Sequence, residues 1–312
     1  MNRREFLASS LAAATSGMLV TAGEPNAAMP IVDTHQHLWD LKKFRLPWIK
    51  PEAPLNHSYL PEDYAKATEG LNVVKSVYME VDVDPKQQSE EVEYITELCK
   101  SGRTPTVAAV VSGRPNSDGF KVYVTPLRDN KYIKGIRQVL HGESTPAGYC
   151  LTKEFMKGIQ LLGTLGLSFD LCMRAPELPD ATKLIDACPD TRFILDHCGN
   201  EPVTKKDHTQ WKKDIAELAK RKYVVGKVSG IVASAKPGEW KADDLAPIIN
   251  QVLEVFGPER VMFGGDWPVC TLAATYRQWV EALKTIVKER SEEQQKKLFH
   301  DNAVKFYGLD KV

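Results

Sequence analysis

The sequence predicts a protein of the α/β class, a single (β/α)8 TIM barrel with an extra C-terminal helix. Three observations carry this prediction. Eight short apolar runs each precede a segment of helical periodicity, and strict alternation of this kind implies parallel strands joined by right-handed crossovers. The eight units occupy about 280 residues, the size of such a barrel. Unusual polar residues follow the apolar runs, where the strands of such a barrel end.

The predicted strands are short and continuously apolar, as expected of strands that are covered on both faces. They occupy residues 31–34, 73–81, 106–111, 132–140, 167–173, 192–195, 223–228 and 260–263. An open doubly wound sheet is the alternative architecture. It fits less well because no glycine-rich phosphate loop follows the first strand.

The predicted helices show apolar residues at every third or fourth position, for example Trp211, Ile215 and Leu218. They occupy residues 61–68, 89–100, 120–128, 153–165, 178–187, 209–221, 243–256 and 276–288, and a last helix spans 292–307. Residues 40–59 fit neither pattern, and their prolines indicate an irregular segment. Because this segment is rich in aromatic residues, we interpret it as a lid or pocket wall rather than as disorder.

Residues 1–29 differ in composition from the rest of the chain. Arg3 and Arg4 precede an Ala-rich apolar run and then small residues, which is the arrangement of a signal peptide. The paired arginines indicate the twin-arginine export signal of bacteria, and an amphipathic N-terminus without a targeting role is the alternative. We expect residues 30–312 to form the barrel domain, exported to the periplasm or the medium, with no membrane anchor in the mature form.

The balance of charge narrows the partners. The 312 residues contain 41 Lys and Arg against 41 Asp and Glu, which gives no reason to expect nucleic acid or an anionic membrane as a partner. The six cysteines form no Cys-x-x-Cys pair, so neither a zinc knuckle nor a disulfide framework is indicated. The expected partner is a small-molecule substrate, and association into a homo-oligomer is left open.

The polar residues that end the predicted strands are the candidates for chemistry, because this fold places its active site there. In an extended strand Asp33, His35 and His37 would share one face, and two histidines at that spacing can converge on one metal ion or one substrate oxygen. Later strands contribute Glu80, Arg137, His141, His197 and Asp266. Each has an ordinary alternative: Asp266 could cap the following helix, and His141 could be a hydrogen-bonded core histidine.

Six motifs together resemble the amidohydrolase-2 branch of the amidohydrolase superfamily, especially sugar-lactone hydrolases of the fuconolactonase and rhamnonolactonase type. The resemblance covers the whole predicted barrel domain. The motifs are DTHQHLW at 33–39, GIRQ at 135–138, LDHCG at 195–199, KVSG at 227–230, FGGDWP at 263–268 and NAVKFYGL at 302–309.

This resemblance implies a metal site at the first and last strands. His35, His37 and Asp266, together with Glu80, would hold one divalent ion, zinc or manganese, in an open three-ligand site. The family's fifth-strand histidine is missing, since that strand ends in Asp170, Cys172 and Arg174. A two-metal centre is therefore not expected, and catalysis without metal is left open.

The implied reaction is the opening of a small cyclic ester, a sugar-derived lactone. Asp266 would activate water as the general base, and His197 or His141 would protonate the leaving alkoxide. Arg137 would hold a carboxylate or hydroxyl groups of the substrate. Three tryptophans would stack on the sugar ring: Trp39, Trp48 and Trp267. The alternatives are a metal-dependent amidohydrolase or decarboxylase on the same barrel, and an exported sugar-binding protein without catalysis.

Overall fold

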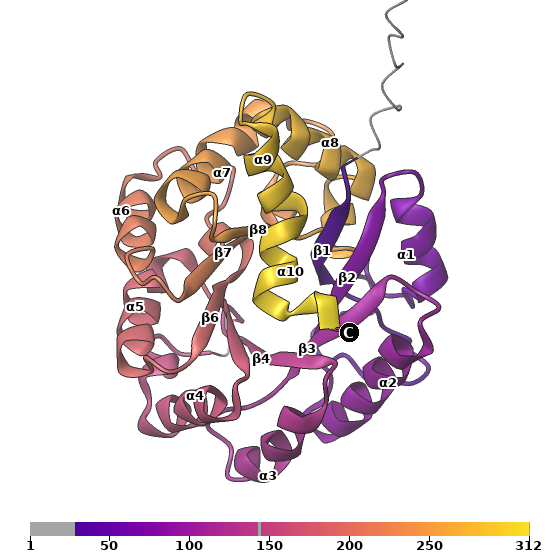
Figure 1. The fold of residues 1–312 in the computed structure, drawn as a ribbon, viewed down its shortest axis with the longest axis vertical. Coiled ribbons are helices and arrows are strands. Elements are labelled where there is room, and N and C mark those ends of the chain that lie inside the picture. Colours follow the sequence, from indigo (N-terminus) through magenta and orange to yellow (C-terminus); the bar gives the residue numbers. More distant parts are fainter. Residues whose placement is uncertain (1–28, 143–144, 312) are drawn as a thin grey trace, which may run out of the picture.

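Eight parallel strands form a nearly closed barrel in the order of the sequence, which confirms the predicted fold class (Figure 1). The computed structural model describes residues 29–142 and 145–311. The predicted signal peptide therefore lies outside the described residues, apart from Met29. The strands are β1 (Ile31–Gln36), β2 (Val73–Met79), β3 (Thr106–Ser112), β4 (Ile133–Val139), β5 (Ser168–Cys172), β6 (Arg192–Leu195), β7 (Val224–Val228) and β8 (Val261–Phe263).

Helices surround the barrel as an outer ring, at the positions that the periodicity predicts (Figure 1). They are α1 (Pro61–Thr68), α2 (Gln88–Ser101), α3 (Phe120–Val124), α4 (Lys153–Leu165), α5 (Leu178–Ala187), α6 (Thr209–Leu218), α7 (Ala242–Phe256) and α8 (Tyr276–Val287). The helix predicted at 120–128 changes to a 3-10 turn at Thr125–Asp129. Pro126 explains the change because proline lacks the backbone donor that an α-helix needs. None of the described helices combines the length and apolarity required to cross a bilayer.

The C-terminal helix closes the amino end of the barrel. It comprises α9 (Glu292–Lys296), a π-helical turn and α10 (Asn302–Tyr307), which lies across the barrel in Figure 1. Arg192 and Lys75, near the starts of β6 and β2, donate hydrogen bonds to the carbonyls of Phe306 and Leu309. The barrel interior at this end is apolar: Val32, Val77, Met79, Ala108, Val110, Ile194, Met262, Ala303, Tyr307 and Leu309.

β1 is irregular where the sequence predicts regular alternation. Its pairing with β2 shifts register between Asp33 and Gln36. Asp33 points outward to Tyr64 of α1 and Tyr276 of α8, whereas His35 lies against charged groups of β6 and β7 in the interior. The expectation that Asp33 shares a face with the histidines is therefore wrong, because the irregularity breaks the period of two.

The segment from 40 to 59 forms a wall beside the barrel mouth. Its ends are fastened by two backbone hydrogen bonds between Trp39 and Tyr59, of 3.0 and 2.8 Å. Within it, Trp48 Nε1 donates to the carbonyl of Val81, just beyond β2, at 2.7 Å. The segment thus lies over the carboxyl end of β2, where a pocket wall is expected.

Candidate active site

A cavity of about 450 Å³ opens at the carboxyl ends of the strands. Most of the predicted site residues line it, including Asp266 and three of the four predicted histidines. Its lining comprises His37, Trp39, Trp48, Glu80, Val81, Asp82, Arg137, Val139, His141, Gly142, Cys172, His197, Asn200, Gly230, Ala233, Ser234, Asp266 and Val269. His35 lies beneath this surface and is fully buried. The cavity is large enough for a small ring substrate.

Asp266 is the centre of the polar cluster. Its Oδ1 lies 3.3 Å from His37 Nε2 and 3.6 Å from His35 Nε2. The His37 Nδ1 atom lies 3.0 Å from two carbonyl oxygens, those of Met79 and Glu80. A carbonyl only accepts, so Nδ1 carries a hydrogen, and Nε2 is the ring nitrogen that faces Asp266. A water or a cation bound beside Nε2 and Oδ1 can contact both atoms.

His197 faces the cavity from the loop after β6. Its backbone N–H donates to Ser229 Oγ at 3.4 Å, and its Nδ1 lies 3.0 Å from the same oxygen. A hydroxyl both donates and accepts, so in one tautomer of His197 Nδ1 accepts the Ser229 hydrogen and Nε2 carries the ring hydrogen. Gly230 makes room for this ring, since a Cβ there would lie 2.2 Å from His197 Nδ1.

Both reactive side chains sit on strained backbone. Asp266 has φ of 52° and His197 has φ of 53°, in the left-handed region that residues other than glycine rarely adopt. Such positions cost about 1–3 kcal/mol each and cluster at functional sites. The Asp266 N–H donates to the carbonyl of His35 at 2.7 Å, which stabilises the turn after β8.

Arg137 forms its hydrogen bonds with other residues of the protein. Nε donates to Glu80 Oε1 at 2.7 Å and Nη2 to the Glu80 carbonyl at 2.9 Å, while Nη1 lies 3.3 Å from Asp196 Oδ2 and 3.1 Å from His35 Nε2. Only 4% of the residue is exposed. Burial alone would raise the pKa of Glu80, but Arg137 and Arg114 hold it below its ordinary value.

Beneath the site lies an ion network that the sequence analysis missed. Lys227 of β7 is fully buried, and its Nζ lies 2.8 Å from Asp170 Oδ2 and 2.9 Å from Asp196 Oδ1. Despite burial, Lys227 and His35 hold the pKa of Asp196 well below its usual value. The sequence does show charged residues within two apolar strands, Asp170 and Lys227, and one directly after a third, Asp196. Only the three-dimensional arrangement of the strands shows that these three side chains meet.

Burial keeps three histidines of the site neutral: His35, His141 and His197. It lowers the pKa of His35 well below the ordinary histidine value and also lowers the pKa of His141 and His197. Desolvation disfavours the charged imidazolium, and for His35 and His197 it outweighs the attraction of nearby aspartates. All three rings are therefore uncharged at neutral pH and available as hydrogen-bond partners or metal ligands.

The donor set fits one divalent metal ion. Donor atoms of His35, His197 and Asp266 all lie within 4.8 Å of one another. The 3.6 Å between Asp266 Oδ1 and His35 Nε2 is close to the roughly 3.4 Å between neighbouring ligands of a tetrahedral zinc ion. His197 stands in this set where the sequence predicts His37. Arg137 is the competing group, because its guanidinium donates toward His35 Nε2. Glu80, a predicted ligand, is not part of this donor set, since its carboxylate is bonded to Arg137 and Ser112.

The three predicted tryptophans occupy different surroundings. Trp48 is 41% exposed at the rim, and its ring lies 5.8 Å from that of Trp39, which is buried in the wall. Trp267 does not line the cavity. Its ring packs against Tyr59 and Tyr64 at 5.3 and 5.5 Å, and only its carbonyl serves the site by accepting from the His37 N–H at 2.8 Å.

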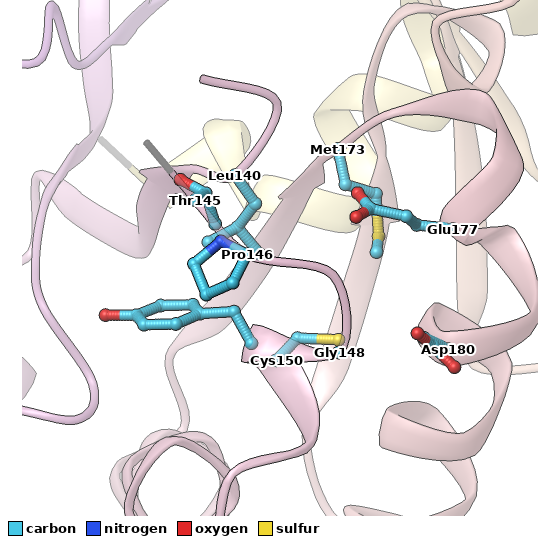
Figure 2. A pocket seen from close by; sticks show the side chains of 9 residues that line it. Leu140, Thr145, Pro146, Gly148, Cys150, Met173, Glu177 and Asp180 are labelled. Atoms are coloured by element: carbon cyan, nitrogen blue, oxygen red, sulfur yellow. The ribbon is translucent and has the colours of Figure 1, made fainter. Parts of the chain in front are cut away.

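A second, much smaller cavity lies under the loop that follows β4 (Figure 2). It measures about 10 Å³, is lined by Leu140, Pro146 and Met173 among others, and holds a single water at most. Arg174 braces this loop by donating to the carbonyls of Gly142 and Thr145 and to Glu177. The brace supports the loop that carries His141, which lines the main cavity.

Histidines and an aspartate at the strand ends of a (β/α)8 barrel are the arrangement of a hydrolytic barrel enzyme. Residues 32–309 match the family model described as "Amidohydrolase" (Amidohydro_2). The chain belongs to this family and is a hydrolase, which confirms the resemblance drawn from the six motifs.

The sequence similarity to named relatives extends over most of the chain. An L-fucono-1,5-lactonase of Burkholderia multivorans is 28% identical, over 89% of this chain and 96% of its own. An L-rhamnono-gamma-lactonase of Scheffersomyces stipitis is 23% identical, over 89% and 98%. A Burkholderia multivorans amidohydrolase solved with bound zinc is 25% identical, with a TM-score of 0.79 over 89% of this chain and 99% of that one.

Proposed function

We propose that the protein hydrolyses a small, uncharged lactone derived from a sugar. The observation that carries the proposal is the placement of Asp266 Oδ1 beside two histidine nitrogens, at 3.3 and 3.6 Å, in a cavity walled by Trp39 and Trp48. The arrangement joins a proton acceptor to an aromatic surface on which a sugar ring can lie. The lactonase names of two relatives support the same reaction.

In the proposed mechanism a water lies beside His37 Nε2 and Asp266 Oδ1, which are 3.3 Å apart, and contacts both. Asp266 takes a proton from this water as its oxygen attacks the lactone carbonyl. The Nε2–H of His197 donates to the oxyanion that develops. Asp266 then returns the proton to the departing alkoxide, with His141 at the cavity wall as a relay. A divalent ion held by His35, the other tautomer of His197 and Asp266 would, when bound, polarise the carbonyl as a Lewis acid in place of the His197 Nε2–H.

The charges of the cavity favour an uncharged substrate. Among the lining residues that the structure describes, Arg137 is the only arginine or lysine, and Glu80 and Asp196 already neutralise it. Asp266 adds a further negative charge to the wall, whereas the charge of Asp82 is paired with Arg114. A carboxylated substrate would meet these groups without a free cation to bind it. This argues for a neutral lactone over a decarboxylase substrate, and against the expected carboxylate fork of Arg137.

The test is a substrate panel assayed with and without a chelator. We expect proton release from neutral aldonolactones and little from carboxylated lactones or amides. Asp266→Asn should lower kcat by about 10²–10⁴-fold, because positioned general bases contribute that much, while the circular dichroism spectrum stays the same. Asp186→Asn, which removes an exposed carboxylate bonded to Arg221, is the matched control.

Two results would contradict the proposal. Near wild-type turnover by Asp266→Asn would remove Asp266 from the mechanism. Tight binding of a lactone without release of acid would favour a sugar-binding protein instead. Against that alternative stands Asp266 beside the two histidine nitrogens, because a protein that only binds a sugar needs no such proton acceptor.

We also propose that residues 1–29 direct export through the twin-arginine pathway. The pair Arg3 and Arg4 before an apolar run motivates this proposal. Fusion of the segment to a reporter should export it from a bacterial cytoplasm, and replacing both arginines by lysine should retain it inside. Export that is unaffected by the double replacement would contradict the proposal.

A further inference from the structure

The seam between β1 and β8 carries the reactive cluster but has almost no regular strand pairing. Within the described residues, the two ends share one parallel bridge, between Gln36 and Trp267. His35, His37 and Asp266 nevertheless depend on this seam for their relative positions. Backbone hydrogen bonds join His37 to Trp267 and Asp266 to His35 at the end of the seam. Further bonds must hold the seam in place below them.

The side chains of Thr34 and Asp33 supply these bonds. Thr34 Oγ1 donates to the carbonyl of Phe263 in β8 at 2.6 Å, and Asp33 joins the two strands nearer to the reactive cluster. Asp33 Oδ1 accepts from the backbone N–H of Gly265 at 2.7 Å and of His35 at 2.9 Å. Gly265 directly precedes Asp266. One carboxylate oxygen therefore joins the segment after β8, which carries Asp266, to β1, which carries His35. A change in either contact alters the distance between Asp266 and His35.

Two helices hold the other oxygen of Asp33. Its Oδ2 accepts from the hydroxyl of Tyr64 in α1 at 2.8 Å and of Tyr276 in α8 at 3.0 Å. The carboxylate is fully buried, and all four donors are uncharged. Burial raises the pKa of Asp33, and its four hydrogen bonds act in the opposite direction. Four donors converging on two oxygens match a carboxylate, which only accepts.

Gly265 allows the close approach that this arrangement needs. A Cβ at this position would lie 2.6 Å from Asp33 Oδ2 and 2.3 Å from the ring of Tyr276. Asp33 faces outward by alternation with the interior residue Val32, and the register shift that follows it brings His35 to the interior. The carboxylate therefore lies between the barrel and its helices. Donors from β1, α1, α8 and the segment after β8 thus all bind the carboxylate of Asp33.

We propose that Asp33 is a positioning residue that fixes Asp266 relative to His35 and His37. This inference rests on the proposed function in one respect, namely that Asp266 performs the chemistry. Tyr64 and Tyr276 act through Asp33 by holding its carboxylate in place. None of the three touches the cavity, so they affect the rate of reaction rather than the binding of substrate.

The first test separates positioning from general stability. Asp33→Asn leaves an amide that cannot accept all four bonds, and kcat should fall by about 100-fold with KM within about twofold, as expected of a misplacement near 1 Å. The double variant Tyr64→Phe/Tyr276→Phe should lower kcat by about tenfold. Tyr78→Phe is the matched control, because its buried hydroxyl donates to Glu91 at 3.0 Å, away from the seam. It should lose comparable stability while kcat stays near that of the wild type.

The second test does not depend on the substrate. Histidine ring nitrogens of ¹⁵N-labelled protein report the contacts of His35 and His37 with Asp266. In Asp33→Asn, and in the milder Tyr276→Phe, these signals should move toward those of Asp266→Asn, and they should not move in Tyr78→Phe. If no lactone is turned over, the proposed function fails while this test still decides the role of Asp33. Histidine signals that are unchanged in both seam variants would overturn the inference.

Discussion

Asp266 and His197 reach the cavity because their backbones adopt a conformation that these residues rarely take. Both have φ near 50° directly beyond a strand, where the chain turns away from the barrel. The conformational cost is offset by hydrogen bonds that hold each turn, such as that between Asp266 N–H and the carbonyl of His35. At the scale of single residues, the site combines strained backbone with neutral, buried imidazoles.

The neutrality of the histidines predicts the pH dependence of the reaction. Burial lowers the pKa of His35 and His197, so each gains its proton at a lower pH than a free imidazole does. We expect kcat/KM to stay constant from about pH 8 to about pH 6.5, the ordinary histidine value, and to fall only at lower pH. The measurement is a pH profile of kcat/KM at constant ionic strength. An acid limb centred above pH 7 would contradict the prediction, because it would show that the histidine that must be neutral has a raised pKa.

Arg137 is predicted to matter mainly for stability. Arg137→Met should lower the free energy of unfolding by about 3–5 kcal/mol, since it leaves Glu80 and Asp196 buried without their partner. Urea unfolding measures the loss. Lys236→Met, which removes an exposed pair with Glu239, should leave the free energy of unfolding nearly unchanged. If Arg137→Met loses little free energy of unfolding and shows a raised KM, Arg137 binds the substrate instead.

At the scale of elements, the cavity is formed by the segments that follow the strands rather than by the strands alone. The wall from 40 to 59 is attached to β1 through Trp39 and to β2 through Trp48. The loop after β4 is braced by Arg174 in the same way. These attachments give irregular segments defined positions without regular secondary structure.

Trp48 tests the role of this wall. Trp48→Ala should raise KM for the lactone by about two- to tenfold, because an aromatic contact contributes roughly 0.5–1.5 kcal/mol, and should change kcat much less. Steady-state kinetics with the best lactone of the panel provide the measurement. Val122→Ala, at an 81% exposed position in α3, is the control. An unchanged KM would place the substrate away from the rim.

At the scale of the whole molecule, the two ends of the barrel have separate tasks. The carboxyl end holds the cavity and its polar cluster, while the C-terminal helix covers the apolar amino end (Figure 1). The buried ion network of Lys227, Asp170 and Asp196 lies within the barrel next to His35. We therefore expect changes at the amino end, away from His35, to alter stability without altering the chemistry.

Leu309 provides the test of that separation. Leu309→Ala should lower the free energy of unfolding by about 2–5 kcal/mol, the usual cost of truncating a buried leucine, with kcat unchanged at temperatures where the protein stays folded. Thermal or urea unfolding, followed by kinetics, measures both. Lys305→Ala, at an exposed position of α10, should change neither. A fall in kcat for the folded Leu309 variant would show that the two ends are coupled.

The sequence alone determined the barrel, its eight units and its C-terminal helix, because burial on both faces leaves a local record in every strand and helix. It also indicated His37, His197 and Asp266, since the carboxyl ends of parallel strands meet at one end of a barrel. These inferences needed only the order of the elements and the polar residues that end the strands.

Only the tertiary structure decided which side chains meet. The irregularity of β1 put His35 on the opposite face from Asp33. The register of β5, β6 and β7 joined Lys227 to Asp170 and Asp196, and Trp267 packed away from the cavity. Arg137 likewise proved to be bonded within the protein. The physical reason is the same in each case: side-chain direction and pairing depend on contacts between strands far apart in the sequence, and local patterns carry no information about those contacts.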